Sequence, residues 1–546
     1  MPGSRSTRTP SSPLEVISGY ARHRNTLGSW LASRAAAVPE REFVVFGARS
    51  LSYREVARQV ERAAAMFAAR GVKPRDRVGV MSLNHPSTVV TLYALARLGA
   101  IMVPVNPEYR ATEARYLLSH AQVSGVVCSP QALDTVREAC EPIAPAPWLL
   151  LNEPGKQGLP VFAEELDRAS GEVPAEAATP DSICVFIYTS GTTGFPKGVM
   201  HSQQSMVLAG EGFVERMHLQ PEDRLMCILP MFHVNALFYS LSGSIAAGAT
   251  LILVPRFSAS TFWRTAAESG ATEVNTIAAV SNILMRRPRS EFVPGHGLKK
   301  LYGGPFSEEV YRVFQGEFGV STVIEGYGMS EIPGALNNPF AGPHKIGSMG
   351  TPSLHPDPRV LLTEMKVTDE QGHELPAGGK GELVVKTPIV MKGYYRDPEQ
   401  TAAAFRDGWF LTGDLGWRDE DGYFWFVARK KDIIRKRGEN ISGAEIDRVI
   451  ESHPDVLQAA AIPVPSELGE DEILVAVVAK PGATLSAETL AAWCRERLAA
   501  IKVPRYVVFV DSLPRTPTHR VEKFKMRVDA TLRERAVDLG ETGNKR

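Results

Sequence analysis

The stretch YTSGTTGFPKG (residues 188–198) places glycines, hydroxyl side chains and a lysine directly after an apolar run. That run, ICVFIYT (183–189), has the length and composition of a buried β-strand. Gly191 and Gly194 let backbone N–H groups approach a phosphate without interference from a Cβ atom. The stretch therefore predicts a phosphate-binding loop, with these candidate ligands: Thr189, Ser190, Gly191, Thr192, Thr193, Gly194 and Lys197.

The loop differs from a Walker loop, which reads GxxxxGK[ST] and leads straight into a helix. Here the lysine, Lys197, is followed by Gly198. A glycine- and threonine-rich surface loop is the simplest alternative. Eleven specified positions directly after a predicted strand favour the phosphate site.

The sequence on both sides of the loop alternates between strand and helix patterns. YREVARQVERAAAMFAARG (53–71) predicts an amphipathic helix, and RVGVMS (77–82) and SGVVCS (124–129) predict strands. The run 89–105 predicts a buried helix that leads into a strand, and the same rhythm continues to about residue 328. Alternation of this kind indicates a mainly parallel sheet covered by helices.

The pattern changes near residue 345. From about 345 to 427, short strands alternate with glycine, proline and aspartate turns, which predicts a small β-rich lobe. A run rich in basic residues follows at 427–439. Beyond it, helix and strand patterns together predict a separate α+β unit of roughly 110 residues.

Composition excludes several functional classes. The chain has 546 residues, 44% of them hydrophobic, and 61 basic residues balance 61 acidic ones, so no global charge favours nucleic acid or an anionic membrane. Five scattered cysteines form no CxxC pair, which fits a reducing cytoplasm. The most apolar run, 89–105, is too short and too interrupted to span a membrane.

The loop at 188–198 resembles the signature loop of the adenylate-forming (ANL) superfamily, and the resemblance extends from about residue 27 to 530. The closest match is to bacterial acyl-CoA synthetases. This resemblance implies an acid–thiol ligase that uses ATP, Mg²⁺ and coenzyme A. Enzymes of this kind make an acyl-adenylate from a carboxylic acid and ATP, and then pass the acyl group to CoA.

The resemblance also implies an α/β fold with a large N-terminal domain and a small C-terminal domain on a hinge. The N-terminal domain would consist of helix-covered sheets and the β-rich lobe, and the C-terminal domain would be α+β. The expected boundaries are a disordered tail at 1–26, the N-terminal domain at 27–428, the hinge at 429–432 and a mobile domain at 433–546.

GYGMSE (326–331) resembles the superfamily's YGxTE element. The resemblance implies that Tyr327 stacks on adenine, that Ser330 contacts the α-phosphate and that Glu331 holds Mg²⁺, a cation that prefers oxygen ligands. Glu325 stands where an amide side chain often reads adenine. Taken alone, Glu331 is equally compatible with a solvated acid at the start of a helix.

WFLTGD (409–414) and ARKKD (428–432) resemble the ribose-binding and hinge elements of the superfamily. Asp414 can accept hydrogen bonds from both ribose hydroxyls. Arg429 corresponds to the arginine that contacts ribose, and Lys431 falls at the hinge position. The neighbouring Lys430 and Lys436 are interpreted as solvated linker residues: two lysines with no expected role in the chemistry.

Three further segments complete the expected site. RGENIS (437–442) resembles the loop that lines the pantetheine tunnel. PMFHVNA (230–236) carries a histidine interpreted as a gate between the acyl pocket and the thiol tunnel. Two glycines in YGGPF (302–306) are expected to leave volume for a bulky acyl group beside the predicted helix at 275–284. The residues concerned are Gly438, Glu439 and Asn440 for CoA, and His233, Gly303 and Gly304 for the acyl pocket.

LPRTPTHRVEK (513–523) is aligned with the loop that delivers the superfamily's C-terminal catalytic lysine. The usual Gly-Lys is His519-Arg520 here. Arginine is a wide planar fork, whereas lysine is a compact ammonium on a thin stem, so Arg520 presents a different geometry. Lys523 is a possible substitute, although we expect it one turn into a following helix and directed elsewhere.

Three functions remain open from the sequence. The first is a complete ligase in which Arg520 replaces the lysine. The second is an acyltransferase that performs only the thioester half-reaction, on an acyl-adenylate supplied by a partner enzyme. The third is a nucleotide-binding protein without catalysis. The sequence does not identify the acid or the oligomeric state.

Overall fold

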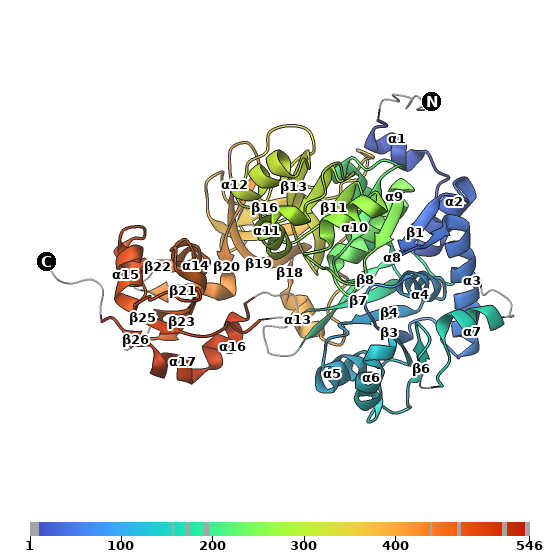
Figure 1. The fold of residues 1–546 in the computed structure, drawn as a ribbon, viewed down its shortest axis with the longest axis horizontal. Helices are drawn as coiled ribbons and strands as arrows, with labels where there is room; N and C mark the ends of the chain where they lie inside the picture. The colour runs from blue at the N-terminus through green and yellow to red at the C-terminus, as the bar shows by residue number, and fades with distance from the viewer. Residues whose placement is uncertain are drawn as a thin grey trace. The chain divides into compact units, whose positions relative to one another are not determined.

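The computed structural model describes residues 10–155, 158–169, 175–189, 196–436, 439–466, 471–515 and 521–540. The chain forms two compact units (Figure 1). Unit 1 comprises Met1–Met365 and Val385–Phe410, and unit 2 comprises Lys366–Val384 and Leu411–Arg546. The domain boundary expected at residue 428 stays a prediction. The two units divide the β-rich lobe between them, so the border between the units is a different one.

Unit 1 contains two large sheets whose central strands are mostly parallel. The first has the order β15-β14-β13-β12-β11-β9-β10-β1-β2, and the second β6-β5-β3-β4-β7-β8. The first sheet consists of β1 (Glu42–Phe46), β2 (Arg49–Ser52), β9 (Arg224–Cys227), β10 (Thr250–Leu253), β11 (Glu273–Asn275), β12 (Lys300–Gly303), β13 (Thr322–Met329), β14 (Ile332–Asn337) and β15 (Thr351–Pro352). The second consists of β3 (Arg77–Met81), β4 (Ile101–Val105), β5 (Gly125–Cys128), β6 (Trp148–Leu151), β7 (Ile183–Thr189) and β8 (Lys197–Ser202).

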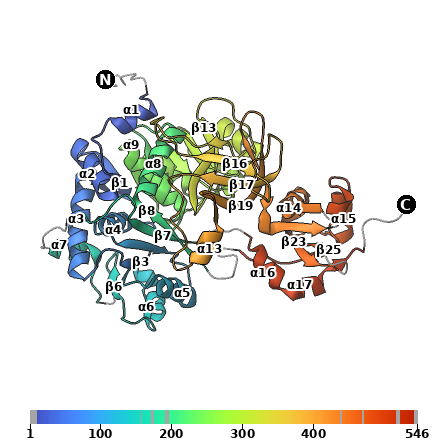
Figure 2. The ribbon, with the colours of Figure 1, turned by 180° about the vertical axis from the view of Figure 1, so that it is seen from behind.

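Helices cover these sheets, as the alternating pattern predicts (Figures 1 and 2). The predicted amphipathic helix is α3, which begins with a capping box in which Ser52 and Glu55 satisfy each other's backbone N–H groups. The predicted buried helix is α4, followed by β4. The main helices of unit 1 are α1 (Pro13–Ser18), α2 (Leu27–Ala37), α3 (Tyr53–Ala69), α4 (Pro86–Arg97), α5 (Ala111–Ala121), α6 (Leu133–Cys140), α7 (Phe162–Arg168), α8 (Gln203–Met217), α9 (Ser242–Ala247), α10 (Phe262–Ser269), α11 (Ala278–Arg286), α12 (Glu308–Tyr311) and α13 (Pro398–Ala403).

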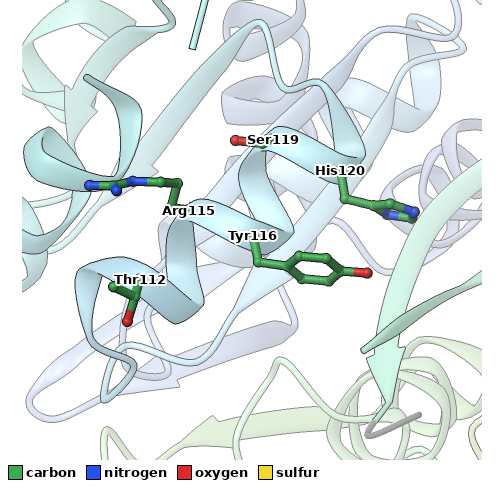
Figure 3. Close-up of a pocket in the computed structure, with 5 residues that line it drawn as sticks. All are labelled: Thr112, Arg115, Tyr116, Ser119 and His120. Carbon is green, nitrogen blue, oxygen red and sulfur yellow. The ribbon is translucent and has the colours of Figure 1, made fainter. Parts of the chain in front are cut away.

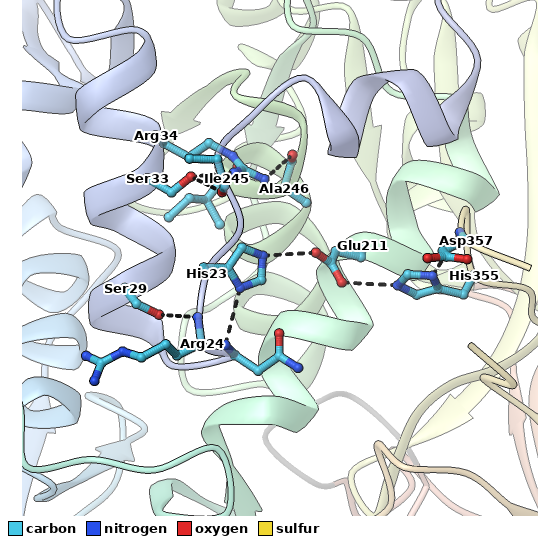
Figure 4. Close-up of polar contacts among 12 residues, drawn as sticks. His23, Arg24, Ser29, Ser33, Arg34, Glu211, Ile245, Ala246, His355 and Asp357 are labelled. Carbon is cyan, nitrogen blue, oxygen red and sulfur yellow. Dashed lines mark hydrogen bonds and ion pairs between the residues drawn. The ribbon is translucent and has the colours of Figure 1, made fainter. Parts of the chain in front are cut away.

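The segment before α2 is ordered from residue 10 onward, so the expectation of a disordered tail at 1–26 is wrong for residues 10–26. Val16 of α1 is buried. His23 Nε2 lies 3.2 Å from Glu211 of α8, and the other oxygen of Glu211 lies 3.1 Å from His355 (Figure 4). Both histidines accept a backbone N–H at Nδ1, which leaves Nε2–H to donate to the carboxylate. These contacts hold the pKa of Glu211 at about 2 despite its burial.

Unit 2 contains an α+β body in which alternate strand residues face two different cores. Ala461 and Val475 pack with α14 and α15 on one side, and Ile462 and Leu474 pack with α16 and α17 on the other (Figure 2). Its sheet has the order β23-β24-β25-β26. The elements are α14 (Gly443–Glu451), β23 (Val456–Pro465), β24 (Asp471–Ala479), α15 (Ala487–Arg495), β25 (Tyr506–Phe509), α16 (Lys523–Val528), α17 (Ala530–Arg535) and β26 (Val537–Asp538).

The β-rich lobe and the basic run precede this body. The lobe's sheet has the order β16-β17-β19-β18, with β20 paired to β19. The interpretation of Lys436 as a solvated linker residue is wrong: it is buried and forms an ion pair with Glu472 of β24. The remaining elements are β16 (Glu364–Thr368), β17 (Gly381–Lys386), β18 (Phe405–Arg406), β19 (Trp409–Arg418), β20 (Phe424–Arg429), β21 (Ile433–Lys436) and β22 (Glu439–Ser442).

The predicted α/β fold class is therefore confirmed, with most strands at the expected positions. All five cysteines are buried and free, in agreement with the absence of a disulfide pattern. Among the described residues, no helix combines the length and the apolar character needed to cross a membrane.

Glu273 gives a test of this core. It is fully buried in β11, and neither of its carboxylate oxygens has a hydrogen-bond partner in the described part of the chain. Burial raises the pKa of Glu273 well above its ordinary value of 4.5, and nearby Asp223 adds to the shift. The folded protein therefore keeps this carboxyl group neutral up to a higher pH than the unfolded chain does.

An acid with a raised pKa in the folded state stabilises the fold fully below its unfolded pKa, and that contribution is lost as the pH rises toward the folded pKa. We expect the melting temperature of the parent protein to fall as the pH rises above about 4.5 because of this group. In Glu273→Gln this part of the fall in melting temperature should disappear. The difference in melting temperature between the variant and the parent should therefore grow as the pH rises. Melting temperatures of the variant and the parent that change in parallel with pH would contradict a raised pKa at Glu273.

Candidate active site

The two ends of the predicted phosphate loop are fixed by an antiparallel hairpin. β7 ends at Thr189 and β8 begins at Lys197, and these two residues are directly paired. The intervening candidates Ser190, Gly191, Thr192, Thr193 and Gly194 lie outside the described residues. The hairpin confirms that the loop follows a strand, and Lys197 enters a second strand rather than a helix.

Helix α5 braces both ends of this loop. The hydroxyl of Tyr116 donates to the backbone oxygen of Pro196 (3.1 Å), and His120 Nδ1 lies 2.7 Å from the hydroxyl of Tyr188. Tyr116 and His120 project from the same side of the helix, beside a shallow pocket of about 490 Å³ (Figure 3). The helix therefore holds Tyr188 and Pro196, two described residues that flank the predicted phosphate loop.

The GYGMSE stretch forms the end of β13 and the turn into β14. Tyr327 pairs with Leu336 of β14, and Ser330 and Glu331 occupy the turn. Glu331 is 8% exposed, and it accepts a hydrogen bond from the hydroxyl of Tyr394 (2.9 Å). It is thus not the solvated acid at a helix start that its position alone would allow.

His201 of β8 connects the phosphate hairpin to this turn. It is fully buried, and its Nε2 lies 2.6 Å from the backbone oxygen of Ser330. Burial lowers the pKa of His201 to about 4, so the ring is neutral. Because a carbonyl oxygen can only accept, the single ring proton resides on Nε2.

Glu325 lies one strand away from the predicted acyl-pocket glycines, and the register pairs it with Gly303. Its Oε1 accepts the backbone N–H of Phe306 (3.0 Å). Burial raises the pKa of Glu325 to about 7, although this N–H bond opposes the shift. Glu325 is therefore partly protonated near neutral pH, unlike the amide that often occupies this position.

The two glycines do not leave the space that we expected. A Cβ atom on Gly303 would lie 2.5 Å from the backbone oxygen of Thr276, and one on Gly304, whose φ is +130°, would lie 2.9 Å from Cγ of Glu325. The protein's own atoms fill the volume. Close packing at the end of β12 thus accounts for Gly303, and close packing together with a positive φ accounts for Gly304. The two glycines by themselves give no reason to infer a bulky acyl group.

His233 lies in the connection from β9 to a π-helical segment, Asn235–Leu241. This connection is held by the buried Asn84, whose oxygen accepts the N–H of Met231 (2.8 Å) and whose amide donates to Leu229 (3.0 Å). The His233 ring packs against Phe232. Its proposed gating role remains a prediction.

In unit 2, the predicted ribose-binding pair is brought together by β19 and β20. Asp414 pairs in register with Arg429, and Arg429 Nε lies 2.9 Å from the Asp414 carboxylate. Asp414 is 1% exposed, so the arginine offsets the cost of burying its charge. The structure does not describe Gly438, nor the side chains of three other predicted site residues: Lys431, Glu439 and Asn440.

Lys523 is engaged in an ion pair. Its ammonium lies 2.5 Å from Asp447 of α14, and both side chains are largely buried. It is the first residue of α16 (Lys523–Val528), so it lies at the start of this helix rather than one turn into it as expected. The other candidate of the catalytic loop, Arg520, lies outside the described residues.

Comparisons with known proteins can be set against this geometry. The family model for the AMP-binding enzyme matches residues 31–395, and that for the AMP-binding enzyme C-terminal domain matches residues 445–520. The chain belongs to the AMP-binding enzyme family. Its relatives are acyl-CoA ligases of the ANL superfamily, so it is an acid–thiol ligase.

Individual relatives cover almost the whole chain. A sulfoacetate–CoA ligase from Cupriavidus necator is 33% identical and covers 92% of this chain and 97% of its own. A feruloyl-CoA synthase from Amycolatopsis is 34% identical and covers 92% and 98%. The crystal structure of ATP-bound MatB from Rhodopseudomonas palustris matches with a TM-score of 0.82 at 29% identity, covering 92% and 98%.

The residues present fit the ligands of an ATP-dependent CoA ligase. Mg²⁺ is usually held by one or two carboxylates together with phosphates and water, rather than by an all-protein cage. Glu331 offers one buried carboxylate, and the described residues contain no group of three or more His, Cys, Asp or Glu side chains suited to a metal. This donor set fits a magnesium–nucleotide complex.

The sequence did not identify Tyr394 or His201 as part of the ligase's site. Both contact the GYGMSE turn, but they come from segments distant in the chain. A tyrosine in KGYYRDP (392–398) and a histidine in an apolar strand carry no local signal of such contacts.

The ion pair of Lys523 predicts a structural role. Lys523→Met would leave the buried Asp447 carboxylate without its cation, which typically costs about 3–5 kcal/mol. We expect a clear fall in melting temperature. Lys525→Met provides the matched control, because Lys525 is 62% exposed and pairs within its own helix turn with Glu522.

Replacing both partners, as in Lys523→Met with Asp447→Leu, should restore much of the stability. Activity measured below the melting transition should follow the folded fraction. A Lys523→Met variant that melts like the parent but has lost ATP–pyrophosphate exchange would instead make Lys523 catalytic.

Proposed function

We propose that the enzyme performs both half-reactions of an acyl-CoA ligase. In the first, a carboxylate oxygen of the acid attacks the α-phosphorus of ATP, and pyrophosphate leaves as the acyl-adenylate forms. In the second, the CoA thiol attacks the acyl carbon, AMP leaves and the thiol proton is released. Mg²⁺ would supply charge neutralisation of the phosphates when bound.

The observation that carries this proposal is the buried carboxylate of Glu331, held by Tyr394 in the turn next to Ser330. Only the first half-reaction handles a triphosphate, so only that half needs a metal-binding carboxylate beside a phosphate loop. A transfer-only enzyme would have no use for this arrangement. The position of Lys197, paired with Thr189 at the end of the phosphate loop, supports the same conclusion.

The proposed roles of the chain's residues follow from their chemistry. Lys197 would contact the phosphates as a point charge. Tyr327 would stack on the adenine, and Glu325 would accept a hydrogen bond from its amino group. Asp414 and Arg429 would hold the ribose, with the carboxylate as acceptor. Gly438, Glu439 and Asn440 would line the path of CoA.

A second function keeps specific support. Arg520 replaces the lysine expected in the catalytic loop, and the nearest alternative cation, Lys523, is committed to Asp447. An enzyme with this loop would perform only thioester formation if Arg520 cannot stabilise the first transition state. It would then depend on a partner that supplies the acyl-adenylate.

The acid itself is a separate question. The relatives' names include sulfoacetate, ferulate and indoleacetate, which share a carboxylate and little else. The filled space at Gly303 and Gly304 gives no preference for bulk. A substrate panel should therefore contain small anionic, aromatic and aliphatic acids in equal measure.

Two assays separate the functions. ATP–pyrophosphate exchange with the acid panel reports the first half-reaction, and thioester formation from synthetic acyl-adenylate and CoA reports the second. We expect both to be positive for the parent enzyme. Thioester formation without exchange would establish the transfer-only function, and failure in both would leave a nucleotide-binding protein.

Arg520 provides the sharpest variant. Arg520→Ala should lower exchange by about 10²–10³-fold, the usual effect of removing one preorganised donor from a transition state. Arg520→Lys should retain or increase exchange, because the compact ammonium has the geometry used by relatives. Thioester formation from acyl-adenylate should change little in either variant. Equal exchange in Arg520→Ala and parent would remove Arg520 from the mechanism.

A further inference from the structure

The segment Met391–Tyr394 joins the two halves of the nucleotide site in unit 1. Its backbone pairs with β8: Met200 N–H donates to Gly393 (3.0 Å), and Lys392 N–H donates to Met200 (2.8 Å). At its other end, Met391 N–H donates to the backbone oxygen of Glu331 (2.8 Å). One short segment therefore ties the exit of the phosphate loop to the turn that carries Glu331.

Tyr394 is the one side chain of this segment that contacts charged groups of both halves in the described structure. Its hydroxyl donates to Glu331 Oε1 (2.9 Å), and its ring lies below the ammonium of Lys197, with 4.9 Å from Nζ to the ring centroid. A tyrosine can serve both groups, because its ring face attracts a cation while its hydroxyl donates to an anion.

The backbone around Tyr394 leaves this side chain little freedom. Tyr394 is bridged in antiparallel fashion to Val199, and its N–H donates to the hydroxyl of Thr401 (2.9 Å). Gly393 has a φ of +122°, and a Cβ atom there would lie 2.7 Å from the Thr401 side chain. A residue other than glycine would disturb this turn, so the ring is placed by main-chain geometry.

We infer that Tyr394 is a positioning residue of the nucleotide site: it orients the Glu331 carboxylate toward a magnesium ion and the Lys197 ammonium toward the phosphates. The inference rests on the proposed function, because it assumes that these two groups receive a magnesium–nucleotide complex. Bonding one carboxylate oxygen fixes the rotation of Glu331, and the ring restricts the flexible lysine. Both effects lower the entropy lost when the ligand binds.

The test is equilibrium binding of ATP at different Mg²⁺ concentrations, without acid or CoA. In Tyr394→Phe, the ring below Lys197 remains and only the bond to Glu331 is lost. We expect the Mg²⁺ concentration for half-maximal ATP binding to rise about tenfold, the effect of losing one hydrogen bond to a charged group. Tyr394→Leu should additionally weaken ATP binding measured without Mg²⁺, because the ring contact with Lys197 is also lost.

Tyr395→Phe is the matched control. It removes a hydroxyl from the adjacent residue, whose oxygen lies 3.4 Å from Gln122 on the side of α5. This variant should bind ATP with the Mg²⁺ dependence of the parent. Thermal melts of all variants establish that they are folded at the assay temperature.

The outcomes separate this inference from the proposed function. Mg²⁺-dependent ATP binding that is identical in the parent and in Tyr394→Phe overturns the role of Tyr394 alone. A parent protein that shows no Mg²⁺-dependent ATP binding overturns the proposed function and this role together. An equal loss in Tyr395→Phe would mean that the segment acts only through its packing, which also contradicts the inference.

Discussion

A buried carboxylate at the turn between β13 and β14 sets the main physical constraint on the proposed nucleotide site. Glu331 is 8% exposed, and removing a negative charge from water is costly unless nearby groups compensate for it. The compensation comes from elsewhere in the chain: Tyr394 donates to the carboxylate, and Met391 fixes the adjacent backbone. The proposed site therefore depends on a segment, Met391–Tyr394, in which the sequence indicated no functional motif.

The same constraint explains other features of the fold. Glu211 is buried between His23 and His355, and the two imidazoles keep its pKa at about 2. Asp414 is buried beside Arg429. The Glu211 contacts join elements that are distant in sequence, whereas Asp414 and Arg429 lie on the consecutive strands β19 and β20. Each pairing can break only at the expense of an uncompensated buried charge.

Sequence patterns predicted the strands and the phosphate hairpin well, because alternation and apolar runs are local signals. These patterns failed where two residues in contact are far apart in the sequence. Tyr394 lies 63 residues from Glu331, and the interpretation of Lys436 as solvated missed Glu472 on another strand. His23 was assigned to a disordered tail because polar composition resembles disorder, yet its partner lies 188 residues away on α8. Charge alone does not reveal whether a partner exists.

The pairing of buried charges matters most for the candidate catalytic loop, residues 513–523. A basic residue near the end of the chain can be catalytic only if its charge is available to the reacting phosphate. Lys523 has the right chemistry, but Asp447 already neutralises it within unit 2, and moving it would leave that carboxylate buried and uncompensated. Arg520 lies outside the described residues, and the nearest acid after it in the sequence, Glu522, pairs with Lys525. The proposed first half-reaction therefore raises one question of geometry: whether a guanidinium can replace an ammonium in that loop.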